Sequence, residues 1–299
     1  DFSDPVVQSV TDAGLRRVTA SAKVTSANFF MGIFSPRDFL EGPTVTEAAQ
    51  GVSQIEVMLV LDITGSMNES AGNGKSKIQV LREAAKDFVT IVKANDSKDG
   101  VSIGVVPYAA QVNMPATLRA QFNVLNLSSW GGVANQGVPD INCLEFPTAD
   151  YGTTGVPLTT PIRMAAVADS NSSTTTTTDF VSVASGAPVA TSRACTTNAE
   201  TAGTAWVDAD VNKVLLPTKD PAKVIEKTDR LTAQGNTYIA AGMHVGTDLL
   251  DEAARPIYTN LLAGEPGMAG RPADNNSIQT RKIIILMTDG SHVSNNHIV

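Results

Sequence analysis

The chain has 299 residues, of which 42% are hydrophobic and 17% are charged. This composition supplies enough apolar side chains for a folded core and excludes a wholly disordered chain or a fibrous repeat. The 22 basic and 30 acidic residues give a net charge of −8 without a Lys/Arg block, so the sequence lacks the cationic surface that nucleic-acid binding requires. Its longest apolar runs are far shorter than the roughly 20 residues of a membrane helix, so membrane attachment would need a segment absent from this chain.

The first 54 residues contain two stretches with β-strand character. Leu15–Val24 alternates between apolar and polar residues, and a second β-like stretch surrounds Thr44–Thr46. We therefore predict a β-rich N-terminal segment over residues 1–54, followed by a second domain over residues 55–299. Because the chain begins at Asp1 with neither an initiator Met nor an apolar leader, we expect that an upstream segment was removed or left out.

Residues 55–119 predict a strand, a helix and a second strand. Ile55–Leu61 is almost continuously apolar, which is typical of a strand buried on both faces of a parallel sheet. Lys75–Asn95 carries one apolar stripe at helical spacing, and Val101–Tyr108 is the second strand. Together they predict a right-handed βαβ unit and an α/β fold with a doubly wound, mostly parallel sheet. The stripe consists of Ile78, Leu81, Ala85, Phe88 and Val92.

The remaining chain divides into a polar insertion and a second α/β stretch. Residues 121–216 hold few charges, many Gly, Pro, Ser and Thr, and the run Asn171–Thr178, so we predict a long irregular insertion that is partly mobile around the Thr run. Residues 217–299 predict helices near Pro221–Thr232 and Ile239–Ala254 and a strand at Lys282–Met287.

Two cysteines, Cys143 and Cys195, lie far apart within the insertion. They are either two unrelated buried thiols or one disulfide bond in an exported protein. The second interpretation is favoured, because polar loops gain most from a covalent link and such links persist in oxidising compartments.

Oxygen-bearing side chains follow or precede the predicted elements at three separate places. The first predicted strand ends in Asp62, Thr64 and Ser66, the last one ends in Asp289, and Thr237 opens a helix. In open α/β sheets the carboxyl ends of the strands form the ligand-binding edge. Carboxylates and hydroxyls without His or Cys suit a hard divalent cation, Mg²⁺ first and then Mn²⁺ or Ca²⁺. With only two carboxylates, such an ion would accept an Asp or Glu from a protein partner, and no nucleophile or general base is evident.

These motifs resemble those of the von Willebrand factor A domain. The resemblance rests on the sequences DITGSM after the first strand, GNT before a helix, and IILMTDG at the last strand. It implies a metal-ion-dependent adhesion site, a non-enzymatic role in protein binding, and a sheet with about two more strands after Gly290. Because the chain ends at Val299, we expect those strands outside this sequence or from another chain. The implied metal ligands are Asp62, Thr64, Ser66, Thr237 and Asp289.

A narrower resemblance is to the TadG-like proteins of tight-adherence (Flp-type) pilus systems of bacteria. It rests on VSIGVVPYAAQVN at Val101–Asn113, on LDITGSM, and on NFFMG at Asn28–Gly32. The resemblance implies a membrane helix upstream, which this chain lacks, then a β-rich region and a von Willebrand A domain with large insertions. It further implies an exported protein of the periplasm, outer membrane or cell surface, with other pilus components as partners.

Other functions have less support in the sequence. A von Willebrand A subunit of an intracellular ATP-driven machine, such as a metal chelatase, is the main alternative, and free cysteines would favour it. The stretch Gly72–Lys77 (GNGKSK) lies between a strand and a helix, but Glu69 stands where a phosphate-binding loop needs Gly. His292 and His297 do not have a common zinc spacing, and no hydrolase motif is evident.

Overall fold

The structure is a computed structural model of the 299-residue chain. It describes residues 6–12, 15–27, 39–51, 54–72, 74–124, 142–146, 150–151, 155–164, 168–169, 195–196, 211–233, 235 and 237–290. The chain divides into two compact units, here called the N-terminal unit (Asp1–Gln54 with Ile278–Arg281) and the α/β unit (Ile55–Ser277 with Lys282–Val299). Each unit is described separately.

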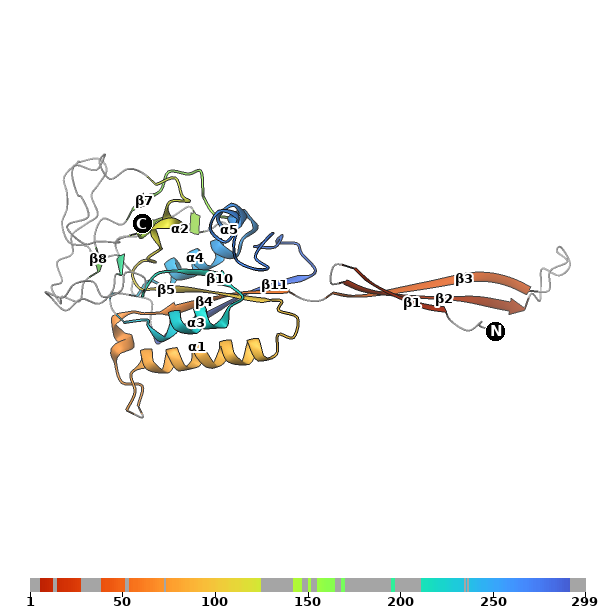
Figure 1. The fold of residues 1–299 in the computed structure, drawn as a ribbon, viewed down its shortest axis with the longest axis horizontal. Coiled ribbons are helices and arrows are strands. Elements are labelled where there is room, and N and C mark those ends of the chain that lie inside the picture. Colours follow the sequence, from red (N-terminus) through yellow and green to blue (C-terminus); the bar gives the residue numbers. More distant parts are fainter. Residues whose placement is uncertain are drawn as a thin grey trace. The chain divides into compact units, whose positions relative to one another are not determined.

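The N-terminal unit contains a three-stranded antiparallel sheet (Figure 1). Its strands are β1 (Val6–Asp12), β2 (Leu15–Ala27) and β3 (Phe39–Gly51), in that order across the sheet. β2 pairs with β3 along its whole length, so both strands extend well beyond the stretches that alternation predicts. β1 was not predicted from the sequence, because its alternation is short and irregular.

The α/β unit is built on a four-stranded sheet in the order β10-β5-β4-β11. β4 (Gln54–Asp62) and β5 (Val101–Tyr108) are parallel and in register from Ile55 opposite Val101 to Asp62 opposite Tyr108. β10 (Leu215–Thr218) is antiparallel to β5 and forms one edge. β11 (Thr280–Met287) lies beside β4 on the other side. The predicted α/β class with a mostly parallel sheet is confirmed at this level, whereas β10 was not predicted and begins inside the insertion expected over residues 121–216.

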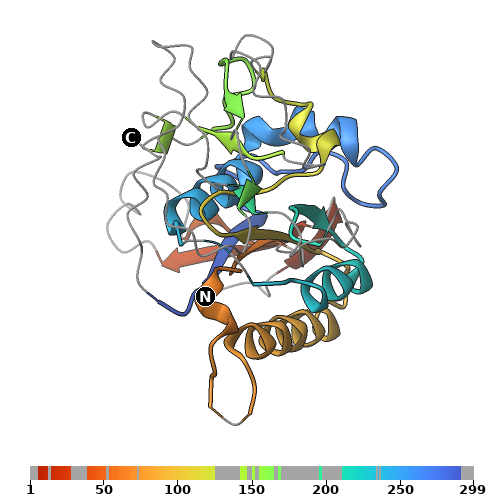
Figure 2. The ribbon, with the colours of Figure 1, turned by 90° about the vertical axis from the view of Figure 1, so that its left-hand side faces the viewer.

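Helices cover both faces of this sheet (Figures 1 and 2). α1 (Lys77–Ala94) and α3 (Pro221–Asp229) lie on one face, where the apolar side chains of α1 pack with alternate residues of β4, such as Leu59. α4 (Ile239–Leu250), α5 (Arg255–Leu261) and the short α2 (Ala116–Arg119) lie on the other face. Because β4 is buried on both faces, its near-continuous apolar sequence is explained.

Two helices differ in detail from the sequence prediction. α1 starts at Lys77 because Ser76 and Gln79 form a capping box, and its buried face uses Val89, with Phe88 and Val92 only partly buried. The helix predicted over Ile239–Ala254 is interrupted at Asp251, which is extended and accepts the Ala253 N–H. A short 3₁₀ turn (η5, Glu252–Ala254) and α5 follow.

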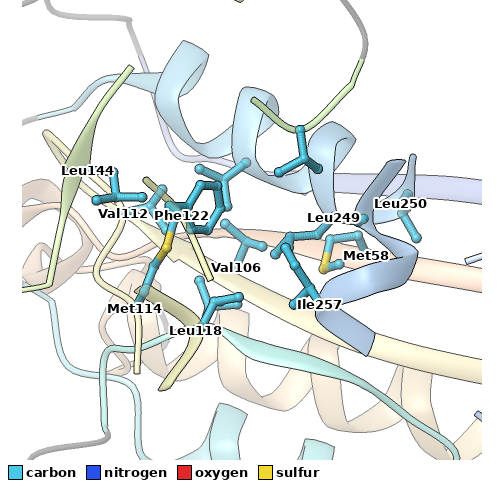
Figure 3. Close-up of a cluster of buried hydrophobic side chains, with 14 of the residues drawn as sticks. Met58, Val106, Val112, Met114, Leu118, Phe122, Leu144, Leu249, Leu250 and Ile257 are labelled. Atoms are coloured by element: carbon cyan, nitrogen blue, oxygen red, sulfur yellow. The ribbon is translucent and has the colours of Figure 1, made fainter. Parts of the chain in front are cut away.

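Parts of the predicted insertion contribute to the core instead of forming an irregular surface. Leu144 belongs to the hydrophobic cluster beside Val112 and Phe122 (Figure 3), and Ile162 is fully buried in the same cluster. Short strands pair here, β6 (Leu144–Glu145) with β7 (Arg163–Met164) and β8 (Ala168–Asp169) with β9 (Cys195–Thr196).

Several sequence predictions fall outside this description. The run 171–178 and the residues His292 and His297 lie outside the described residues. Cys143 is fully buried, but the side chain of Cys195 is not described, so a disulfide between them stays a prediction. Among the helices that the structure describes, none combines the length and the apolar sequence needed to cross a membrane.

Candidate metal site at the carboxyl end of the sheet

Asp62 is the last residue of β4 and is fully buried. Its Oδ1 accepts the backbone N–H of Thr64, two residues further along the chain, at 2.9 Å. Its Oδ2 accepts the hydroxyl of Tyr108 at 3.2 Å and that of Thr288 at 2.8 Å. Three donors from three separate segments therefore fix the orientation of this carboxylate and satisfy its buried oxygens.

A chain of hydroxyls links the first loop to the second carboxylate. The Oγ1 of Thr64 lies 3.1 Å from the Oγ of Ser66, and Ser66 donates to the Oδ1 of Asp289 at 3.0 Å. Asp289 follows β11 closely, and β11 is the neighbour of β4 in the sheet. The structure thus brings together Asp62, Thr64, Ser66 and Asp289, four of the five predicted ligands.

Thr237 reaches the same region through its loop. The Gly65 N–H donates to the Gly235 carbonyl at 2.8 Å, and Tyr238 donates its N–H to Ala109 at the end of β5. A Cβ at Gly65 would lie 3.3 Å from the Gly235 oxygen, so the close approach of these two loops favours glycine there. Thr237 is buried, and within the described part of the chain its hydroxyl forms no hydrogen bond with the other four side chains.

One cation already lies at this site. The ammonium of Lys77 donates to the Oδ2 of Asp289 at 2.7 Å and to the Oε2 of Glu69 at 2.8 Å. Its hydrogen bonds to these two carboxylates raise the pKa of Lys77 above the ordinary value for lysine. The outer oxygen of Asp289 is therefore placed to meet positive charge.

The sequence analysis missed three residues of this site, namely Lys77, Tyr108 and Thr288. Burial, together with the nearby carboxylate of Asp62, raises the pKa of Tyr108, so its hydroxyl stays protonated and remains a donor. Tyr108 is directly opposite Asp62 in the β4–β5 register, a pairing between two strands that the sequence pattern did not indicate. Lys77 offered no such signal, because it follows a glycine-rich loop and is the first residue of α1.

The donor set fits a hard divalent cation. It consists of two carboxylates and three hydroxyls, and oxygen ligands of this kind are those that Mg²⁺ and Ca²⁺ prefer. Among the described residues, no group of three or more His, Cys, Asp or Glu side chains is arranged to hold a metal ion. The same composition does not suit zinc, which needs nitrogen or sulfur ligands.

A second polar cluster lies on α4. The Nε2 of His244 is 3.4 Å from the Oδ2 of Asp248, and both side chains are at least 95% buried. The His244 ring stacks on Tyr151 and meets Phe146 edge-on, with ring centroids 4.6 and 4.7 Å away. Burial, with a smaller contribution from nearby carboxylates such as that of Asp251, raises the pKa of Asp248 to about 8.

Burial lowers the pKa of His244. At neutral pH the imidazole is therefore neutral, and the carboxyl of Asp248 is protonated. A neutral pair does not offer the charged ligands of a cation site. This cluster is consequently part of the packing between α4 and the residues that follow β6.

Comparison with known proteins gives little further information. No protein-family model matches the chain, and no curated protein matches it. Similar solved structures include the pilus adhesin SpaC of Lactobacillus rhamnosus GG, with 18% identity, a TM-score of 0.18, and coverage of 37% of this chain and 11% of that one.

Two streptococcal structures cover more of this chain. The adhesive tip pilin GBS104 of Streptococcus agalactiae shares 13% identity with a TM-score of 0.34, covering 80% of this chain and 46% of its own. The pilus adhesin RrgA of Streptococcus pneumoniae shares 10% identity with a TM-score of 0.31, covering 97% and 25%. The chain thus spans less than half the length of each, and similarities this slight assign no function.

Proposed function

We propose that this chain is a non-enzymatic, metal-dependent protein-binding module of the von Willebrand factor A type. The observation that carries the proposal is the hydrogen bond from Ser66 to Asp289, which joins the loop after β4 to the end of β11 across the sheet. Carboxylates from two neighbouring strands and hydroxyls between them form an oxygen-lined site at the edge where open α/β sheets bind ligands.

In this proposal Asp62 and Asp289 supply negative charge, and the hydroxyls of Thr64, Ser66 and Thr237 supply neutral oxygens. The bound ion, Mg²⁺ in the first place and Mn²⁺ or Ca²⁺ as alternatives, would supply a coordination position for a carboxylate of another protein. Because only two of the five protein ligands are charged, an Asp or Glu side chain of a partner would complete the set. No reaction is assigned to the site, since its hydroxyls face carboxylates and no described histidine adjoins them.

The proposal extends to location and partners. An exported protein of the bacterial periplasm, outer membrane or cell surface, with pilus components among its partners, agrees with the sequence resemblance to TadG-like proteins. A disulfide between Cys143 and Cys195 belongs to the same proposal, because such bonds persist in oxidising compartments.

A magnesium titration of the purified chain tests the proposal. We expect calorimetry to detect Mg²⁺ binding, and 1 mM Mg²⁺ to raise the free energy of unfolding by about 1.4 kcal/mol if the dissociation constant is roughly 100 μM. Asp62→Asn and Asp289→Asn should abolish both effects. The control is Asp229→Asn, which removes an exposed carboxylate on α3 and should bind Mg²⁺ as the wild type does.

Circular dichroism would establish that each variant is folded. The proposal fails if the wild-type chain binds no divalent ion, or if both site variants bind it unchanged. If binding is confirmed, an acidic peptide should associate with the chain in Mg²⁺ and dissociate when EDTA is added.

A further inference from the structure

Lys77 occupies a position that the helix itself does not favour. It is the first residue of α1, and the first turn of α1 contains no acidic residue. A positive side chain is unfavourable there, because the helix N-terminus already carries partial positive charge. The ammonium is nevertheless well positioned, since Asp289 and Glu69 both accept hydrogen bonds from it. Its partners, and not the helix, therefore account for its placement.

The two partners of Lys77 differ in exposure. The side chain of Asp289 is 9% exposed, whereas that of Glu69 is 67% exposed. Glu69 is also tied to Lys77 through the main chain, because the Lys77 N–H donates to the Glu69 carbonyl at 2.9 Å. The ammonium can therefore leave Asp289 and remain beside Glu69 without a rearrangement of the loop between them.

We propose that the Lys77 ammonium is an internal cation of this site, which neutralises Asp289 in the ion-free protein and must move to Glu69 when a divalent ion binds. This inference rests on the proposed function. The Oδ1 of Asp289 accepts the Ser66 hydroxyl, so its Oδ2, now paired with Lys77, is the oxygen that a divalent ion would need. Two cations repel each other at one carboxylate, so the ammonium and the ion compete.

Two consequences follow from this competition. Lys77 sets the concentration of divalent ion above which the site fills, and it stabilises the partly buried Asp289 carboxylate below that concentration. Removing the ammonium should therefore strengthen ion binding while making the ion-free protein less stable. A residue with a purely structural role would change stability without strengthening ion binding.

The experiment measures Mg²⁺ binding to Lys77→Met by calorimetry, and thermal melting in EDTA. We expect Lys77→Met to bind Mg²⁺ about fivefold more tightly, the upper range for a partly exposed ion pair, and to melt at a lower temperature in EDTA. The matched control is Lys75→Met, since Lys75 is two residues away and pairs with the exposed Glu83 at 2.6 Å. This control should bind Mg²⁺ with the wild-type affinity.

A double-mutant cycle adds a second readout. Glu69→Gln removes the alternative partner of the ammonium, so it should weaken Mg²⁺ binding in the wild type and have less effect once Lys77 is Met. If Lys77→Met binds Mg²⁺ equally or more weakly than the wild type, Lys77 is not a competitor and the inference is overturned, with the proposed function intact. If neither protein binds a divalent ion, the proposed function fails and this inference fails with it.

Discussion

Replacing Asp248 by Asn should stabilise the protein, and the gain should depend on pH. Asp248 is almost fully buried on α4, and in the described structure neither of its carboxyl oxygens has a hydrogen-bond partner. Its pKa is about 8, compared with 3.8 for an ordinary aspartate. One pKa unit corresponds to 1.36 kcal/mol. At pH 7 the folded protein keeps this carboxyl protonated, whereas the unfolded chain has released the proton. The 3.2 pKa units between pH 7 and the ordinary value therefore lower the free energy of unfolding by roughly 4 kcal/mol, compared with a residue that does not titrate.

The sign follows from the proton balance of the two states. Below about pH 4 the Asp248 carboxyl is protonated in both states, so it adds no pH dependence. Between about pH 4 and pH 8 the unfolded chain has released this proton while the folded protein still holds it. The free energy of unfolding therefore falls as the pH rises through this window and levels off above it. Asn is neutral at every pH and nearly the same size, so Asp248→Asn removes this dependence.

Urea unfolding of the wild type and Asp248→Asn at several pH values between 4 and 9 would measure the difference. We expect nearly equal stability at pH 4 and a growing advantage for the variant up to pH 8. Asp87→Asn, which changes an exposed position on α1, should stay within about 0.5 kcal/mol of the wild type throughout. A difference between the Asp248 variant and the wild type that is constant over this pH range would refute the reasoning.

The first-loop ligands were predictable because their positions depend on local sequence. The strand β4 ends where its apolar run ends. The sequence therefore indicates that Asp62 lies at the edge of the sheet and that Thr64 and Ser66 lie in the loop that follows. Asp289 was predictable in the same way from the apolar run of β11. That these two strands are neighbours depends on long-range packing, which no short pattern specifies, and only the resemblance to a known family supplied it.

The parts that could not be predicted depend on contacts between distant segments. Lys77 belongs to the site only because α1 begins beside the end of β11. The glycine-rich sequence before Lys77 predicts only a flexible segment that precedes the helix. His244 has no distinctive neighbours in sequence, and its burial results from packing against Phe146 and Tyr151 in the predicted insertion. β10 has only four residues, one of them Pro217, so neither its length nor its composition indicated a strand.

Two further substitutions test buried contacts of the α/β unit. Arg271→Met should cost about 3–5 kcal/mol in urea unfolding, because it leaves the buried Glu56 carboxylate, 3.5 Å from the Arg271 guanidinium, without its nearest counter-charge. Adding Glu56→Gln should recover part of the loss, and a cost below about 1 kcal/mol would contradict the argument. Gly242→Ala should cost about 1–3 kcal/mol and weaken Mg²⁺ binding, since its Cβ would lie 2.6 Å from the Tyr108 ring, whose hydroxyl orients the predicted metal site. Gly264→Ala, with open space around the added methyl, is the matched control, and equal effects of the two glycine substitutions would rule out this steric explanation.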